Sequence, residues 1–304
     1  MLNRQKVLLY MLAEAGRPVS HLELVKWSFL LRKETASGGG NSFYEFLPYH
    51  YGPFSFCLYK EVTTMKRRRL LLTPTRNTWQ ATQTCPPDGG ALGTPIKEDV
   101  LDLLTQFKDR SVRGLTDYVY LRHPWFTVNS KGSKKCQRPL AEHAAYTVGY
   151  EGLQVDAFLN NLIRSGITRL IDVRHNPIAR RYGFHKKTLG RLCGHVGINY
   201  IHIPQVGIPS AWRRQLRSNA DYRALFMRYE HETLESETET IDQIAALMVE
   251  KPSALMCAEA NPDLCHRAVL AKAVARRTGL PIRHLGGIAE WWPITSALEF
   301  LLSQ

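Results

Sequence analysis

One stretch decides the fold: residues 253–278 read SALMCAEANPDLCHRAVLAKAVARRT. The first five residues are small or apolar and fit a short buried strand, whereas His266–Thr278 has the length and composition of a helix. The same alternation of strand and helix runs from residue 144 to residue 285. It is typical of an α/β domain with a mainly parallel, Rossmann-like sheet that carries helices on both faces.

The strands expected from this alternation lie at 145–149, 169–174, 199–203, 253–257 and 282–285. Helices are expected at 154–164, 186–196, 221–231, 240–250 and 266–278. Ligands of open parallel sheets bind beyond the carboxyl ends of the strands, so the residues after each strand are the first place to look for chemistry.

Polar residues follow each of the first four of these strands in the sequence. A single such residue has an ordinary structural explanation, such as a turn cap or a local ion pair, but several together indicate a site. We expect the catalytic groups to be Asp172, Glu259, Arg174 and His202. We expect a surrounding pocket made of Tyr150, Glu151, Asn176, Tyr182, Phe184, Cys257, Cys265, His266 and Arg267.

Four of these segments carry a family resemblance: YTVGYEG at 146–152, IDVRHNP at 171–177, NYIHIPQVG at 199–207 and MCAEANPDLCHR at 256–267. Over residues 144–285 the chain resembles the domain-of-unknown-function 488 (DUF488) family. The resemblance implies the same α/β fold and a link to DNA processing and defence, with removal of modified bases as one activity. His175 and Asn176 depart from the basic or small residues that usually follow the Asp-x-Arg motif in the family.

Several chemistries fit the cluster. A DNA glycosylase needs an extruded base, aromatic side chains to stack on it, and a carboxylate beside the anomeric carbon, for which Asp172 and Glu259 are candidates. A metal-dependent nuclease would use the same carboxylates with His202 or His266. Zinc is a further alternative, although Cys257 and Cys265 lack the close cysteine pair of a closed structural site.

Thiol chemistry at Cys265, which starts a helix beside His266, also stays open. A different class of function is a DNA-binding regulator whose α/β domain senses a nucleotide without turning it over. The chain is strongly basic, which indicates DNA as its partner. We therefore expect a hydrolase that excises a modified base from double-stranded DNA, with no cofactor and no resident metal.

Charge is unevenly distributed along the chain, whose formal net charge is +13. Residues 1–140 hold 21 Lys and Arg against 11 Asp and Glu, a surplus of 10, while the remainder holds 19 against 16, a surplus of 3. A basic first half indicates an anionic partner such as DNA. The residues expected to contact DNA are Lys66, Arg67, Arg68, Arg69, Lys131, Lys134, Lys135, Arg180, Arg181, Arg213 and Arg214.

The first 84 residues resemble a winged helix-turn-helix domain. Helices are expected at 5–15, 20–31 and 56–69, followed by two short strands at 70–74 and 79–82, and the turn before the third helix reads YHYGPFS at 49–55. This order places one helix in the major groove of DNA and uses the rest to hold phosphates. The alternative for the basic run Lys66–Arg69 is a solvated helix end whose positive charge complements the helix dipole.

We therefore expect three segments: a DNA-binding domain at 1–84, a helical extension with a basic linker at 85–143, and the α/β catalytic domain at 144–304. The six scattered cysteines are typical of a reducing compartment. With no apolar run of about 18 residues and no signal-peptide pattern, the expected location is the cytoplasm, away from membranes.

Overall fold

The computed structural model describes residues 1–82, 92–132, 135–214 and 216–286. The chain divides into two compact units that interleave along the sequence. Unit 1 holds residues 1–140, 153–166 and 178–197, and unit 2 holds residues 141–152, 167–177 and 198–304. Two segments that the sequence places within the α/β domain, 153–166 and 178–197, are thus grouped with the N-terminal part.

Unit 1 begins with the expected three helices and hairpin. They are α1 (Asn3–Glu14), β1 (Val19–Ser20), α2 (His21–Glu34), α3 (Phe56–Arg67), β4 (Leu71–Leu72) and β5 (Thr78–Ala81). The short strands form an antiparallel sheet in the order β1-β5-β4. Ser20 caps α2 through a capping box with Glu23, as the Ser-x-x-Glu spacing predicts.

The segment expected to be a plain turn before α3 is instead a small hairpin. β2 (Leu47–Tyr49) pairs in antiparallel fashion with β3 (Gly52–Phe54). The strands have three residues each and contain proline, so their pattern is too short for the period of two to show. Gly52 has φ +98°, a left-handed conformation that suits glycine at this reversal.

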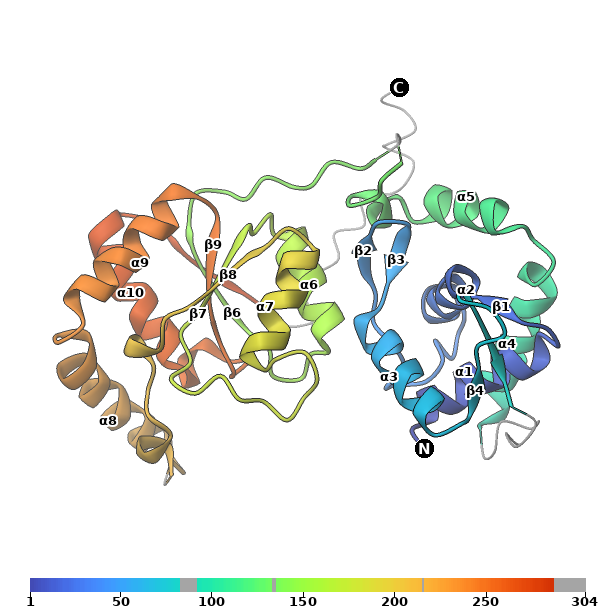
Figure 1. Cartoon of the computed structure of the whole chain (residues 1–304). Coiled ribbons are helices and arrows are strands. Elements are labelled where there is room, and N and C mark those ends of the chain that lie inside the picture. The colour runs from blue at the N-terminus through green and yellow to red at the C-terminus, as the bar shows by residue number, and fades with distance from the viewer. Residues whose placement is uncertain (83–91, 133–134, 215, 287–304) are drawn as a thin grey trace. The chain divides into compact units, whose positions relative to one another are not determined.

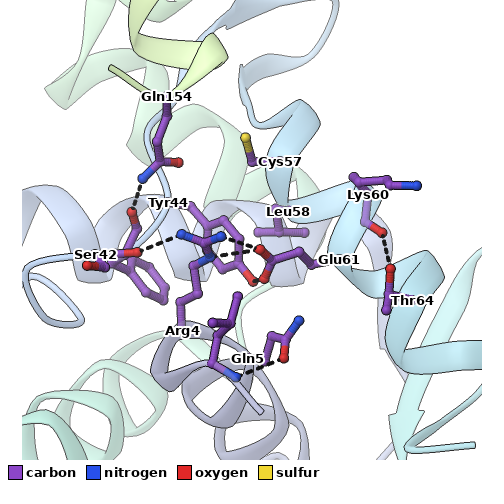
Figure 2. A network of polar contacts seen from close by, with 12 residues as sticks. Arg4, Gln5, Ser42, Tyr44, Cys57, Leu58, Lys60, Glu61, Thr64 and Gln154 are labelled. Atoms are coloured by element: carbon purple, nitrogen blue, oxygen red, sulfur yellow. Dashed lines mark hydrogen bonds and ion pairs between the residues drawn. The ribbon is translucent and has the colours of Figure 1, made fainter. Parts of the chain in front are cut away.

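A partly buried polar network joins α1 and α3 within unit 1 (Figure 2). Glu61 on α3 pairs with the guanidinium of Arg4 on α1 and accepts a hydrogen bond of 2.8 Å from the hydroxyl of Tyr44. The Nε2 of Gln154 donates to the backbone carbonyl of Phe43 at 2.7 Å. Because Tyr44 is fully buried, this network fixes the segment between α2 and β2 against the helices.

The remaining described secondary-structure elements of unit 1 are helices. They are α4 (Thr94–Phe107), α5 (Val112–Arg122), η1 (Pro124–Thr127), α6 (Val155–Arg164) and α7 (Lys186–His195). The fully buried carboxylate of Asp156 on α6 lies at the N-terminus of α3, where it accepts hydrogen bonds from the backbone N–H groups of Phe56 (2.6 Å) and Cys57 (3.0 Å) and from the Ser55 hydroxyl (3.2 Å). Burial raises the pKa of Asp156 to about 6.

Unit 2 is built on a five-stranded sheet in the order β10-β6-β9-β7-β8, with every neighbouring pair parallel. The strands are β6 (Ala145–Gly149), β7 (Arg169–Asp172), β8 (Asn199–His202), β9 (Ser253–Cys257) and β10 (Ile282–Leu285). The sheet is flanked by helices, so the predicted α/β class is confirmed. Figure 1 shows β6 to β9 side by side, with α9 and α10 next to them.

The helices of unit 2 are α8 (Asn219–Tyr229), α9 (Thr238–Glu250) and α10 (His266–Thr278), with short helical turns η2 (Pro204–Val206), η3 (Ser210–Arg213), η4 (Glu230–Leu234) and η5 (Pro262–Leu264). A shared core forms where the fully buried Ile171 and Leu255 of the sheet meet Ile244 of α9 and Leu270 and Val274 of α10. This packing fixes the sheet on which the polar strand ends are mounted.

Among the described residues, no helix is long and apolar enough to cross a membrane. The expected DNA contact Lys134 and part of the linker segment expected at 85–143 lie outside the described residues.

Candidate active site at the strand ends

The backbone brings the ends of β6 and β9 into direct contact. The N–H groups of Tyr150 and Glu151 both donate to the carbonyl of Ala258, at 3.1 and 2.9 Å. A Cβ on Gly149 would collide with the carbonyl of Glu259, so only glycine allows this approach. The loops after these two strands therefore form one surface, as expected for the carboxyl ends of parallel strands.

The end of β7 carries a sealed ion pair. Asp172 is fully buried and forms a bidentate pair with Arg174, with N–O distances of 2.8 Å from Nε and 2.6 Å from Nη2. Its oxygens also accept hydrogen bonds from the backbone N–H of Arg174 at 3.1 Å and from the hydroxyl of Tyr200 at 2.6 Å. With four donors on its two oxygens, the carboxylate of Asp172 holds Arg174 in place.

The surroundings of this pair are aromatic. Tyr150 accepts a hydrogen bond of 3.2 Å from Nη1 of Arg174, whose guanidinium carbon lies 5.2 Å from the centre of the Tyr150 ring. Burial would lower the pKa of Arg174, but hydrogen bonds to Asp172 and the charge of that carboxylate outweigh it and raise the pKa. Burial, followed by the charge of Asp172, raises the pKa of Tyr200 well above its usual range.

The end of β9 carries a second, more open pair. Glu259 forms an ion pair with Arg213 of η3 and accepts a hydrogen bond of 3.2 Å from the thiol of Cys257. The side chain of Glu259 is 22% exposed and that of Arg213 is 27% exposed. Burial opposes ionisation of Glu259, but the charge of Arg213 and hydrogen bonds from the thiols outweigh it and lower the pKa to about 2.

A cluster of soft ligand atoms lies beside that pair. Nδ1 of His266 is 3.7 Å from the sulfur of Cys257 and 4.0 Å from that of Cys265, and it accepts a hydrogen bond of 2.9 Å from Nη2 of Arg213. All three cluster residues are buried. Burial raises the pKa of the Cys265 thiol well above its usual range, which disfavours Cys265 as a free thiolate nucleophile.

Arg267 positions the loop that carries Glu259. It is 1% exposed and donates to the backbone carbonyls of Glu259 and Ala260 and to the hydroxyl of Thr147 on β6, at 3.4 Å for the last. Its donors therefore face backbone and hydroxyl oxygens, and we assign it the role of bracing the loop.

Other expected residues lie at the edge of this cluster or face elsewhere. Nε2 of His202 contacts the carbonyl of Arg174 at 2.9 Å, which makes His202 a brace for the β7 end. The carboxylate of Glu151 accepts a hydrogen bond of 3.0 Å from the N–H of Ala260. Asn176 is exposed on the loop after β7.

Four residues that the sequence places in the α/β domain belong to unit 1: Tyr182, Phe184, Arg180 and Arg181. Phe184 is fully buried against Phe158, with ring centres 5.3 Å apart, so it would have to leave that core to stack on a base. Tyr182 is half-buried, and the ammonium of Lys60 lies 5.9 Å from the centre of its ring. Arg180 and Arg181 are exposed, with Arg181 donating to the carbonyl of Leu153 at 2.6 Å.

The expected DNA contacts are mostly on the surface. Exposed positions include Lys66, Arg67, Arg68, Arg69, Lys131, Lys135 and Arg214. Arg213 differs, because it is half-buried and its guanidinium faces Glu259 and His266. The structure thus brings Arg213 into the strand-end cluster.

One residue of the cluster, Tyr200, is absent from the residues expected from the sequence, and Arg213 was expected only as a DNA contact. Tyr200 lies two residues before His202 on β8. Because residues two apart on a strand share a face, the expected role of His202 could have pointed to Tyr200 as well. The pairing of Arg213 with Glu259 spans 46 residues and has no local signal.

Comparison with known proteins identifies one part of the chain. Residues 154–274 match the family described as "Domain of unknown function DUF488". No curated protein and no solved structure matches the chain. The match does not extend into the first part of the chain, so the winged-helix interpretation stays a prediction. Residues 154–274, which contain Asp172, Arg174, Cys257, Glu259 and the Cys265-His266-Arg267 motif, belong to the DUF488 family.

Proposed function

We propose that this chain is a DNA-acting hydrolase that cleaves the N-glycosidic bond of a modified base, in genome defence or repair. The observation that carries the proposal is the state of Glu259, a partly exposed carboxylate at the carboxyl end of a parallel strand, oriented by Arg213 and by the thiol of Cys257. Glycosidic cleavage uses a carboxylate in such a position to activate water or to stabilise an oxocarbenium-like charge.

The two candidate carboxylates differ in what they can offer a substrate. Both oxygens of Asp172 are occupied by Arg174 and Tyr200, and the residue has no exposed surface. Glu259 is the more accessible of the two. We therefore assign the reacting carboxylate to Glu259 and the support of Arg174 to Asp172.

Support for DNA as the substrate comes from charge. The surplus of basic residues in the first 140 residues includes four consecutive exposed side chains, Lys66 to Arg69, at the end of α3. Basic groups that contact phosphates supply affinity without sequence preference. Extrusion of a base from the duplex then supplies the substrate for the α/β part.

The test is incubation of the full chain with normal DNA and with heavily modified phage DNA, followed by mass spectrometry of released small molecules. We expect a free base from the modified DNA, and loss of that release in Glu259→Gln while DNA binding is kept. Asp263→Asn changes an exposed carboxylate of η5 and is the matched control, with release unchanged.

Other results would overturn the proposal. DNA fragments without a free base would indicate a nuclease. Unchanged DNA, with a footprint at one sequence, would indicate a regulator. Full base release by Glu259→Gln would remove Glu259 from the chemistry.

A further inference from the structure

Three soft ligand atoms converge in unit 2. The sulfurs of Cys257 and Cys265 and Nδ1 of His266 all lie within 4.8 Å of one another, and their side chains come from the end of β9 and the start of α10. A tetrahedral ion with bonds of about 2.3 Å to sulfur and 2.0 Å to nitrogen spaces its ligand atoms by about 3.5–3.8 Å. The observed sulfur–nitrogen separations of 3.7 and 4.0 Å differ little from that spacing.

The imidazole of His266 is held in the form that binds a metal. Its Nε2 lies 3.2 Å from the carbonyl of Val173, which can only accept, so Nε2 carries the hydrogen. Nδ1 therefore presents its lone pair, as its contact with the donor Arg213 also requires. A second hydrogen bond that fixes the ring through its other nitrogen is a regular feature of metal-binding histidines.

The charges around the cluster suit a divalent ion. Two thiolates would balance an ion of charge +2, and the thiol protons, including the one that Cys257 donates to Glu259, would be released to solvent on binding. Cysteine and histidine are the ligands that zinc prefers, whereas magnesium and calcium require oxygen.

Access to the cluster runs past Arg213. Its side chain is 27% exposed and occupies the lone pair of His266 Nδ1, so the ion and Arg213 compete for one atom. Outward rotation of Arg213 would release Nδ1 and leave the carboxylate of Glu259 beside the ion, because Glu259 already contacts Cys257 at 3.2 Å.

We propose that Cys257, Cys265 and His266 bind one zinc ion, with a fourth position open to water or substrate beside Glu259. Three protein ligands and one open position are the arrangement of catalytic rather than structural zinc sites. The inference goes beyond base excision, because a zinc ion at this position would serve hydrolysis of other bonds equally well.

The test is the metal content of the full chain, produced in zinc-supplemented medium and measured by elemental mass spectrometry. We expect about one zinc per chain in the unaltered protein. Cys257→Ser, Cys265→Ser and His266→Asn should each lose most of the bound zinc, because each removes one of three protein ligands. Cys136→Ser removes a cysteine outside the cluster and should keep the zinc, as should Glu259→Gln, which removes the neighbouring carboxylate.

Cobalt supplies a readout that does not depend on variants. Uptake of Co²⁺ by the metal-free chain should produce the intense near-ultraviolet absorption of thiolate–cobalt bonds together with the visible bands of a tetrahedral ion. If a cysteine variant fails to fold, the melting temperature of the unaltered chain with and without a chelator takes its place, and we expect the chelator to lower it.

Three outcomes would overturn the inference: a folded chain that takes up neither zinc nor cobalt, zinc content unchanged in all three ligand variants, or a disulfide between Cys257 and Cys265 found by mass spectrometry. Failure of base release alone leaves the zinc inference standing, because metal content is measured without a substrate.

Discussion

The neighbouring strands β7 and β9 each end in a carboxylate–arginine pair, and the two pairs differ in accessibility. At the end of β7, the side chains of Asp172 and Arg174 are 0% and 6% exposed. At the end of β9, those of Glu259 and Arg213 are 22% and 27% exposed. Asp172 and Arg174 lie two residues apart, and the oxygens of Asp172 already accept four hydrogen bonds. Glu259 and Arg213 come from separate segments, and both side chains are partly exposed to solvent. Accessibility, more than residue type, therefore distinguishes the pair of Asp172 and Arg174 from the pair of Glu259 and Arg213, to which we assign the chemistry in our proposal.

The largest expected effect comes from breaking the sealed pair. Asp172→Asn leaves the buried guanidinium of Arg174 without its counter-charge, and removal of one partner of a buried pair costs about 3–5 kcal/mol. Urea unfolding of the variant and the unaltered chain measures the loss. A loss below about 1 kcal/mol would show that the pair is hydrated and not sealed.

A third carboxylate, Asp156, sharpens the comparison because it faces backbone N–H groups and a hydroxyl in place of an arginine. Burial raises its pKa from 3.8 to about 6, so the native state holds this proton more tightly than the unfolded chain. Its contribution to stability is complete below about pH 4 and is lost as the pH rises through about 6, a change of about 3 kcal/mol.

The measurement is the free energy of unfolding of the unaltered chain and of Asp156→Asn at pH 4 and pH 7. Because the amide does not titrate, the unaltered chain should lose stability relative to the variant as the pH rises. A difference that is the same at both pH values would contradict the raised pKa.

A smaller effect is expected from one donor of the sealed pair. Tyr200→Phe removes the hydroxyl that donates to Asp172 and should cost about 1.5 kcal/mol, as for a hydrogen bond to a charged group. Tyr146→Phe is the matched control, because the hydroxyl of Tyr146 donates to the backbone carbonyl of Glu142. Equal losses in urea unfolding would mean that Tyr200 adds nothing specific to the pair.

The smallest change in stability is expected at the open pair. A double-mutant cycle of Glu259→Gln and Arg213→Gln should give a coupling energy smaller than the loss in Asp172→Asn, because both side chains of the open pair are partly exposed to solvent. Thermal unfolding of the four proteins measures it. A coupling as large as the loss in Asp172→Asn would show that both pairs serve stability.

Local patterns were sufficient for much of the fold. The predicted ranges of β6, β9, α10 and β10 agree with the structure to the residue, because their apolar runs are bounded by clear breaks. The order of strands in the sheet depends on contacts between residues far apart in the chain, so local patterns could not predict it.

The same limit applies to the site. An ion pair between Asp172 and Arg174 was foreseeable, because residues two apart on a strand share a face. Tyr200 meets Asp172 only through the register of two parallel strands, and Arg213 meets Glu259 through the excursion between β8 and β9. Basic character alone assigned Arg213 to DNA, since charge in a sequence does not reveal its counter-ion.

The hydrogen bonds of Asp156 limit how the protein can be truncated or fused to another chain. The chain passes between its two units after residues 140, 152, 166, 177 and 197, so no single cut separates them. A protein truncated to residues 141–304 would keep Asp156 but lose its donors at residues 55–57. A gene fusion that transplanted only the C-terminal part would leave the carboxylate of Asp156 without these donors, so recombination should favour exchange of the two parts together.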